Sequence, residues 1–332
     1  MGEKDWMKKV VHLTDTKKVS QAFENFNIES FKDQSYPFKL HMGELKNKYF
    51  PKPSVVKPFI DELLKIGSNP FFYDTTVAYP GPRHFISGYK RVAKLHGYHK
   101  LGCEIIIDDK GKTVKIEGRD FEVGETLQKS SHIVAFSHVK GHIATGMGAA
   151  IKNFGMGGVT KENKKKMHHA SRPIYSKDKC TYCGVCAEVC PFDALTVEQN
   201  KWKISKRKCF GCGVCVDNCK QGGITNEDKN LQFLLACATL ACVKDKNVIY
   251  INDVNRIADS CDCDPFAKKI LCPDIGFLVS DDPVAIDKAS LDLINDIKED
   301  VFLKHHKVDP IKQIKYGEEI GLGSSSYQLI EI

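Results

Sequence analysis

Residues 180–191 read CTYCGVCAEVCP and residues 209–220 read CFGCGVCVDNCK, and these two runs decide how the middle of the chain can fold. Each run has the spacing C-x2-C-x2-C-x3-C, which is typical of proteins that bind [4Fe–4S] clusters. Three thiolates of one run reach three corners of a cubane, and the fourth cysteine, one helical turn further on, points to the other cluster. The runs therefore predict two interlocked ligand sets: a first cysteine set of Cys180, Cys183, Cys186 and Cys219, and a second cysteine set of Cys209, Cys212, Cys215 and Cys190.

The residues around these cysteines agree with cluster-binding loops. Glycine suits places where the backbone approaches sulfur and donates N–H groups to it, and such places hold Gly184, Gly211 and Gly213. Paired C-x2-C motifs can also hold zinc. Four cysteines within eleven residues, twice, with Pro191 after the first run, favour two clusters over two zinc sites. Lys220 stands where a proline often follows the second run, which affects the exit of the loop and not the ligands.

Outside the cysteine runs, apolar strand patterns alternate with helical patterns. Strands are expected at residues 10–13, 38–42, 70–76, 103–108, 114–117, 132–137, 248–251 and 275–279, and helices at 53–66, 83–96, 144–153, 228–243 and 284–297. This alternation predicts an α/β body with a largely parallel sheet. Because the last third of the chain would make a thin domain alone, we expect it to complete the same sheet. The expected organisation is a discontinuous body of residues 1–160 and 226–332, a linker of residues 161–173, and an inserted ferredoxin-like α+β module of residues 174–225.

The composition indicates where such a protein works. The chain has 332 residues, of which 42% are hydrophobic, and it lacks an apolar run of about 18 residues that would suit a membrane span. Its N-terminal sequence has no apolar region typical of a secretory signal, and Met7 stands where a myristoylation motif has Ser or Thr. Fourteen cysteines then indicate metal ligands and buried thiols rather than disulfides. We therefore expect a protein of a reducing, anaerobic cytoplasm without a membrane partner.

The formal charge of +7 comes from 49 Lys and Arg against 42 Asp and Glu, and much of the excess is local. Two basic runs carry it: Lys161, Lys164, Lys165 and Lys166, and, beside the second cysteine run, Lys201, Lys203, Lys206, Arg207 and Lys208. Both runs are short and lack interleaved aromatic residues, so we interpret them as solvated loop charge and expect no nucleic-acid partner. The second run could steer an acidic redox partner, either a low-potential ferredoxin or a reductase.

Polar residues follow several of the expected strands. Residues 137–142 read SHVKGH and separate an apolar strand from a Gly- and Ala-rich helix. Ligands bind at the carboxyl ends of strands in open α/β sheets, so such groups suit the binding and protonation of an anionic acceptor. The predicted catalytic residues are His138, Lys140, His142 and Lys152, and the predicted substrate-binding residues are His41, Glu44, Arg83 and Asn153. The other interpretation of residues 137–142 is a polar, hydrogen-bonded turn.

A further group of cysteines comprises Cys261, Cys263 and Cys272. Cysteines two positions apart point opposite ways in a strand but can converge in a loop, so this group could form a third metal site or redox thiols, or be a loop with a buried thiol. The other three cysteines are expected to be small buried hydrophobes: Cys103, Cys237 and Cys242. Neither a G-x-G-x-x-G fingerprint nor a P-loop occurs, so NAD, flavin and ATP have no local support.

Several of these segments occur together in one known family. They are residues 41–47, 74–83, 137–142 with Gly146 and Lys152–Asn153, 261–263, and 273–276 through Asp287. Together they resemble the iron–sulfur proteins catalogued as domain-of-unknown-function family 362, over nearly the whole chain. The resemblance implies a two-cluster protein with an α/β body, in prokaryotic and mostly anaerobic settings, and it implies no reaction. The body is also faintly similar to the N-terminal part of nickel-pincer lactate racemases, which use His and Lys around a strand edge.

The leading hypothesis is an oxidoreductase. Its clusters would pass low-potential electrons one at a time to an unknown anionic small molecule held by the α/β body. The alternatives are a non-catalytic electron carrier or adaptor, whose body is a docking surface, and a metal-handling or redox-sensor protein that uses the loop of residues 261–272. The substrate and the direction of electron flow do not follow from the sequence.

Overall fold

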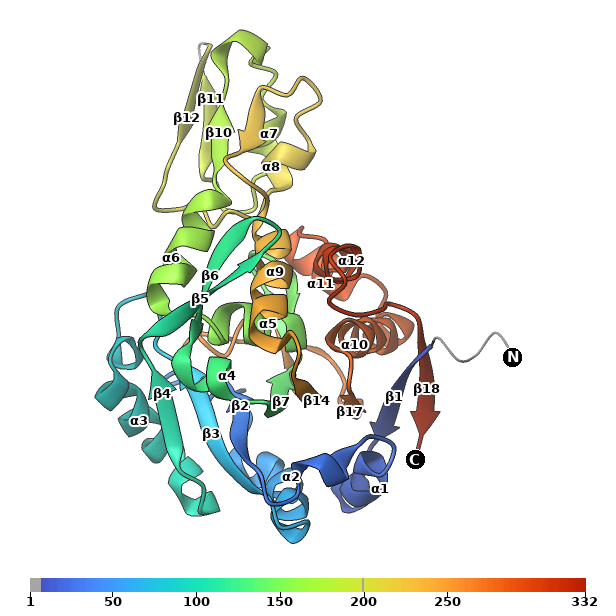
Figure 1. The fold of residues 1–332 in the computed structure, drawn as a ribbon. Helices are drawn as coiled ribbons and strands as arrows, with labels where there is room; N and C mark the ends of the chain where they lie inside the picture. Colours follow the sequence, from blue (N-terminus) through green and yellow to red (C-terminus); the bar gives the residue numbers. More distant parts are fainter. Residues whose placement is uncertain (1–6, 199) are drawn as a thin grey trace.

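The computed structural model describes residues 7–198 and 200–332 (Figure 1). Our expectation for the N-terminal sequence falls mainly on residues 1–6 and so lies outside the described residues. Within the described part of the chain, no helix is both long enough and apolar enough to cross a membrane.

A sheet of eight strands lies at the centre of the described structure, in the order β18–β1–β17–β14–β7–β2–β3–β4. Strands β14, β7, β2, β3 and β4 pair in parallel, as do β1 and β18, whereas β17 is antiparallel to both β1 and β14. The strands span Lys8–Leu13 (β1), Ser35–Leu40 (β2), Asn69–Thr75 (β3), Ile105–Asp108 (β4), His132–His138 (β7), Asn247–Val254 (β14), Gly276–Ser280 (β17) and Tyr327–Glu331 (β18).

The central strands are apolar along most of their length because both faces of the sheet are covered. Val134 of β7 pairs with Ile249 of β14 on one side and with Phe38 of β2 on the other, and all three side chains are buried. Strands from before and after the cysteine runs thus lie next to each other in one sheet. The prediction of an α/β body with a largely parallel sheet is confirmed.

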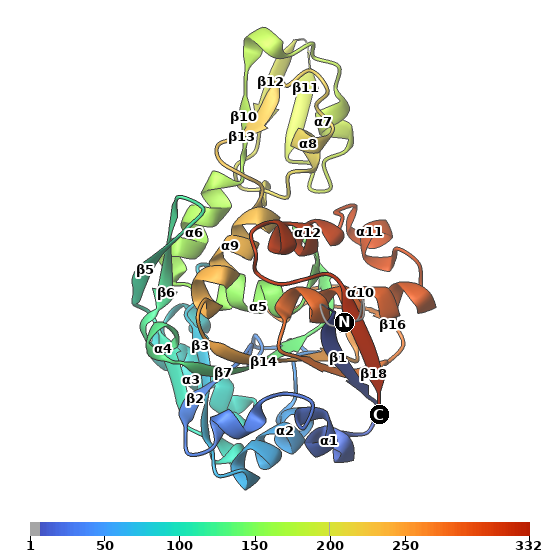
Figure 2. The same cartoon turned by 45° about the vertical axis from the view of Figure 1, so that its right-hand side comes forward.

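Helices cover both faces of the sheet (Figure 2). One face carries α5 (Ala150–Gly157), α9 (Leu231–Val243), α10 (Pro283–Ile297) and α12 (Ile311–Glu319), and the other carries α1 (Val19–Phe23), α2 (Pro53–Lys65) and α3 (Ile86–Leu95). Helix α9 is apolar on all sides because it is buried almost completely. Two short helices complete the body, α4 (Glu125–Lys129) and α11 (Val301–His306), with 3-10 turns at Thr16–Lys18, Ile28–Phe31, Pro82–His84 and Tyr98–Leu101; a fifth 3-10 turn, Lys177–Lys179, lies after residue 173 in the segment that carries the cysteine runs.

Two hairpins differ from the sequence-based prediction. Where we expect one short strand, β5 (Gly111–Ile116) pairs with β6 (Arg119–Gly124) across a turn in which Glu117 and Gly118 both have positive φ, of 50° and 72°. The helix expected from residue 144 begins only at Ala150, because β8 (Lys140–His142) and β9 (Gly146–Gly148) form a small hairpin first. Both hairpins form because each strand pairs with a partner strand, and local strand propensity does not reveal that pairing.

A helix occupies most of the segment for which we expect a linker. Helix α6 spans Lys161–Ala170. Thr160 caps its N-terminus, because the Thr160 side chain accepts a hydrogen bond from the Asn163 amide at 3.3 Å. Asn163, Lys164 and Met167 form its buried side. The run of lysines hides this narrow buried side in the sequence, so the interpretation of all four lysines as solvated loop charge is wrong for Lys164.

Residues 173–226 form a small separate unit, which we call the cysteine unit. Its strands β10 (Pro173–Tyr175) and β13 (Ile224–Asn226) pair antiparallel, so the chain enters and leaves the unit side by side. Strands β11 (Leu195–Glu198) and β12 (Lys201–Ile204) form a hairpin, and the helices are α7 (Val185–Glu188) and α8 (Val214–Asp217). Figures 1 and 2 show the unit projecting from the body beyond α6 and α9. Short strands β15 (Ile257–Ala258) and β16 (Ile270–Cys272) form a last pair in the body.

Candidate functional site

Polar side chains gather at the carboxyl edge of the sheet, where ligands bind in open α/β folds. Strand β2 ends just before His41, Asp74 lies at the end of β3, and His138 ends β7. Two adjoining cavities lie at this edge, and we call them the inner cavity, of about 50 Å³, and the outer cavity, of about 490 Å³. Both are lined by His41, Asp74, Lys152, Met156, Gly157 and Cys261.

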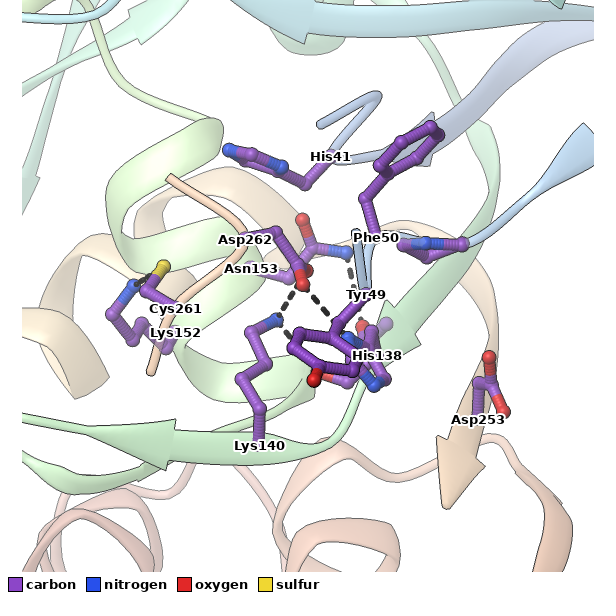
Figure 3. Close-up of polar contacts among 12 residues, drawn as sticks. His41, Tyr49, Phe50, His138, Lys140, Lys152, Asn153, Asp253, Cys261 and Asp262 are labelled. Carbon is purple, nitrogen blue, oxygen red and sulfur yellow. Dashed lines mark hydrogen bonds and ion pairs between the residues drawn. The ribbon is translucent and has the colours of Figure 1, made fainter. Parts of the chain in front are cut away.

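Asp262 is the centre of a buried ionic group beside the inner cavity (Figure 3). Its Oδ1 lies 2.8 Å from Nδ1 of His138, and its Oδ2 lies 3.1 Å from Nζ of Lys140. The Lys140 ammonium also donates to the His138 carbonyl at 2.6 Å, and Nε2 of His138 faces the Asn255 carbonyl at 3.0 Å. Burial works against ionisation, but the charges of Lys140 and His138 hold the pKa of the Asp262 carboxyl far below its usual range. Both nitrogens of His138 are therefore engaged in holding this group in place.

The predicted substrate-binding residues divide into two groups. His41 and Asn153 line the inner cavity, whereas Arg83 and Glu44 line neither cavity. Arg83 is completely buried, and it donates to Oε2 of Glu44 from Nε at 2.9 Å and faces Nε2 of His41 from Nη1 at 2.7 Å. Burial and then the Arg83 charge lower the pKa of His41 well below its usual value. Arg83 and Glu44 thus hold the His41 side chain in position without lining either cavity.

Lys152 lies against a cysteine rather than a carboxylate, as Figure 3 shows. Its Nζ is 3.5 Å from Sγ of Cys261, and both residues line the two cavities. Cys263 lines the outer cavity as well, whereas Cys272 lies in β16, packs in the main core and lines neither cavity. The structure therefore brings together two of the three cysteines of this group. In the described part of the chain, no three His, Cys, Asp or Glu side chains are grouped as for a single metal ion.

His142 lines the outer cavity, with its Nδ1 hydrogen-bonded to Oγ1 of Thr145 at 2.9 Å. Burial and the nearby Lys152 charge lower the pKa of His142 well below its usual value. The ring therefore enters the cavity as neutral imidazole at neutral pH.

Sequence reasoning missed several charged residues of the site. Lys164 lines the outer cavity and donates to Oγ1 of Thr75 at 2.7 Å, and burial lowers its pKa to about 7. Lys39 reaches the inner cavity from β2, where its Nζ donates to Asp74 at 3.0 Å and to Oδ1 of Asn153 at 2.8 Å. The sequence already signals Asp74 by its place at the end of an apolar strand, although Asp74 is not among the predicted site residues. Lys164 gives no such signal, because its neighbours are exposed lysines.

Two cavities in the cysteine unit are each lined by four cysteines. One, of about 470 Å³, is lined by Cys180, Cys183, Cys186 and Cys219, and the other, of about 10 Å³, by Cys190, Cys209, Cys212 and Cys215. These are the two sets that the spacing interlocks. The two runs also have the same local backbone conformation. Gly184 and Gly213, with φ of 81° and 85°, immediately precede α7 and α8. Side chains other than glycine are strained at such angles.

The second cysteine set adjoins the outer cavity of the body. Phe210, between Cys209 and Gly211, lines that cavity together with His168 of α6. Within the described residues, neither cysteine cavity shares a lining residue with the outer cavity, and Phe210 is the link between the second set and that cavity.

The fold and the site define a class of protein in which an α/β body carries a cysteine-rich unit over the carboxyl edge of its sheet. The chain belongs to the family described as "Domain of unknown function (DUF362)", whose model matches residues 38–292. The family resemblance inferred from the sequence is therefore confirmed.

Two solved structures are similar to this chain. The lactate racemase apoprotein from Thermoanaerobacterium thermosaccharolyticum is 11% identical, with a TM-score of 0.38 over 76% of this chain and 52% of that one. A protein from Thermotoga maritima is 9% identical, with a TM-score of 0.40 over 92% of this chain and 59% of that one. The chain thus spans between half and three fifths of the length of these two proteins. No curated protein matches the chain.

Proposed function

We propose that the chain is an iron–sulfur electron-transfer protein, an oxidoreductase that delivers low-potential electrons to an anionic small molecule at the carboxyl edge of the sheet. One observation carries the proposal. Eight cysteines line two cavities in interlocked sets of four, and the second set adjoins the outer cavity of the body.

The cysteine unit supplies what two clusters need from a protein. The first set, with Cys219, would hold one [4Fe–4S] cluster, and the second set, with Cys190, would hold the other. Bound clusters of this type transfer one electron at a time, at reduction potentials between about −700 and +450 mV. Backbone amides already point at sulfur: Tyr182 N lies 3.4 Å from Sγ of Cys180, and Ala194 N lies 3.3 Å from Sγ of Cys190. Such contacts stabilise thiolate ligands and tune the potential.

The outer cavity has the lining of a site for an anion that also has an apolar part. Lys152 and Lys164 are the lysines of its lining, and within the described residues neither forms an ion pair with a carboxylate. Leu231, Leu235 and Phe210 supply an apolar wall on the side of the cysteine unit. A cationic group without a carboxylate partner favours a carboxylate or phosphate ligand.

Proton supply falls to residues that can change charge near neutral pH. Burial lowers the pKa of Lys164 to about 7, which suits a group that holds and releases a proton in the cavity. His138 and Lys140 position Asp262 in this account, and Lys152 and His142 remain the proposed contacts to the acceptor.

A basic surface supports the expected redox partner. The residues of the second basic run are all exposed on and after β12, in the same unit as the cysteine sets: Lys201, Lys203, Lys206, Arg207 and Lys208. Their charge would steer an acidic ferredoxin or reductase toward the cysteine unit.

Anaerobic purification followed by metal analysis and electron paramagnetic resonance tests the proposal. We expect about eight irons per chain and signals from two reduced [4Fe–4S] clusters after treatment with dithionite. A panel of small carboxylates and phosphates should include compounds that reoxidise the reduced protein faster, and Lys152→Met should slow that step. Zinc in place of iron contradicts the proposal. Clusters that no compound of the panel reoxidises would favour a non-catalytic electron carrier.

A further inference from the structure

Cys261 and Cys263 lie in one tight turn at the outer cavity. The Asp264 amide donates to the Cys261 carbonyl at 2.7 Å, which closes the turn, and Nδ2 of Asn47 donates to the Asp264 carbonyl at 2.7 Å. The side chain of Asp262, between the two cysteines, is held by His138 and Lys140. Both cysteines line the outer cavity, so the turn gives them a common side.

The two thiols are unequal partners. Nζ of Lys152 lies 3.5 Å from Sγ of Cys261, and both cysteines line the same cavity. The neighbouring Cys263 thiol and the Lys152 charge lower the pKa of Cys261 well below its usual value, although burial opposes this. The neighbouring Cys261 thiol and burial raise the pKa of Cys263. A thiolate next to a protonated thiol is the arrangement of dithiols that form and break disulfides.

The cysteine unit contributes to the lining of the same cavity. Phe210 lines it and is the residue directly after Cys209 of the second cysteine set. The loop that carries this set therefore reaches the cavity that the two thiols line.

We propose that Cys261 and Cys263 are a redox-active dithiol–disulfide pair that exchanges two electrons with the ligand of the outer cavity. The pair itself stands on the turn, the cavity and Lys152, whereas the source of its electrons rests on the function proposed above. The pair would accept electrons that arrive one at a time and pass two of them together to the ligand.

The exchange is balanced as follows. Reduction would break the Sγ–Sγ bond with two electrons and one proton, and two reduced [4Fe–4S] clusters held by the cysteine unit would supply one electron each. The proton ends on Sγ of Cys263, and Sγ of Cys261 keeps its negative charge opposite the Lys152 ammonium. In the forward reaction the dithiol passes two electrons to a two-electron acceptor, Cys263 loses its proton, and the Sγ–Sγ bond forms again.

Alkylation of the full chain in anaerobic dithiothreitol buffers of graded oxidation tests the pair. A tryptic peptide of residues 257–268 contains Cys261 and Cys263 and no other cysteine, so mass spectrometry isolates their state. We expect this peptide to change in one step from doubly alkylated to an internal disulfide. Double alkylation under every condition overturns the proposal, as does protection of both thiols by a bound metal.

Two variants separate a redox role from a structural one. In Cys263→Ser the peptide should lose its disulfide and retain one reactive cysteine, whereas Cys272→Ser should keep the wild-type behaviour. In Lys152→Met the pH profile of the native-state alkylation of Cys261 should shift to higher pH, because the variant lacks a charge that lowers the pKa of Cys261. Lys161→Met, a lysine paired with Asp109, serves as the matched control. An unchanged pH profile in Lys152→Met contradicts the role of Lys152 in holding Cys261 as the thiolate.

Iron content, measured on the same samples, keeps the two proposals apart. Two clusters without the disulfide would overturn the dithiol and leave the electron-transfer function. The disulfide in a protein that holds no iron would overturn the electron-transfer function and leave the dithiol.

Discussion

The charged residues at the carboxyl edge are buried in pairs. Lys39 pairs with Asp74, Arg83 with Glu44 and Lys140 with Asp262, and all six residues are buried. Removing one partner of such a pair leaves an uncompensated charge and costs about 3–5 kcal/mol. Lys152 and Lys164 differ, because their neighbours within the described residues are a thiol and a hydroxyl. They are therefore the cations that an anionic ligand can use.

Lys164 should make stability depend on pH. Its pKa is about 7 in the folded protein and about 10.5 when unfolded, so between these values the unfolded chain binds the extra proton. The free energy of unfolding therefore gains a contribution as pH rises from about 7 to about 10.5. Denaturant titrations across this range should show a smaller rise in Lys164→Met than in wild type. A wild-type slope in this variant contradicts the account, and Lys165→Met controls for loss of an exposed charge from the same helix.

Two glycines of the cysteine unit should respond differently to alanine. Both have positive φ, but a Cβ on Gly211 would lie 2.1 Å from Oγ of Ser171, whereas a Cβ on Gly184 meets nothing within 4 Å. Gly184→Ala should therefore cost only the backbone strain of about 1–2 kcal/mol. Gly211→Ala should cost more and should loosen the second cysteine set. Equal losses of stability in the two variants would show that the contact with Ser171 is unimportant.

At the scale of elements, helix α5 carries Lys152 and Asn153, and its start is fixed by another helix. Asp287 of α10 accepts hydrogen bonds from the Ala150 and Ile151 amides at 2.8 and 2.9 Å, and from Nδ2 of Asn252 at 3.0 Å. This buried carboxylate satisfies amides that a helix leaves unpaired at its start. It thereby sets the position of Lys152 relative to the cavities.

Asp287→Ala should disturb the site from a distance. Two buried amides lose their acceptor, so the free energy of unfolding should fall by about 2 kcal/mol or more. The control is Asp292→Ala on the same helix, because the partly exposed Asp292 pairs with Lys288 and should cost no more than about 1 kcal/mol. Denaturant unfolding of both variants decides the matter, and similar losses would contradict the role of Asp287 in holding α5.

The sequence reveals elements whose signal is local. The buried strands β2, β3, β7 and β14 follow from their apolar runs, and the start of α10 follows from Asp282 and Pro283, since Asp282 accepts from the Val284 and Ala285 amides. Helix α6 and the hairpins β5–β6 and β8–β9 depend on partners elsewhere in the chain, so their own residues do not predict them. Boundaries that a tertiary contact decides, such as the cap from Asp287, are missed for the same reason.

The same division holds within the site. His41, His138 and Lys152 were found because parallel strands and the following helix bring their ends to one edge. The pairings were not predictable, because Asp262 lies more than a hundred positions after its partners His138 and Lys140 in the sequence. For Cys261 and Cys263 the sequence leaves a metal site, redox thiols and a loop with a buried thiol open, and it does not reveal that both line one cavity.

At the scale of the whole molecule, the cysteine unit is joined to the body by its two ends and by one ion pair. Lys312 of α12 pairs with Asp217 of α8, and Arg119 of β6 pairs with Asp228, just after the unit. Figure 1 shows α6 and α9 leading into and out of the unit. Phe210 brings the loop of the second cysteine set to the outer cavity, which is the arrangement that the proposed electron delivery requires.

The interlocking of the two cysteine sets is the central claim, and Cys190→Ala tests it most directly. Cys190 belongs to the first run in the sequence but lines the cavity of the second set. Electron paramagnetic resonance of the reduced, anaerobically reconstituted variant should therefore show damage to the same cluster that Cys212→Ala damages, while the cluster of Cys183 remains. Loss of the cluster that Cys183→Ala removes, or a wild-type spectrum in Cys190→Ala, would contradict the account.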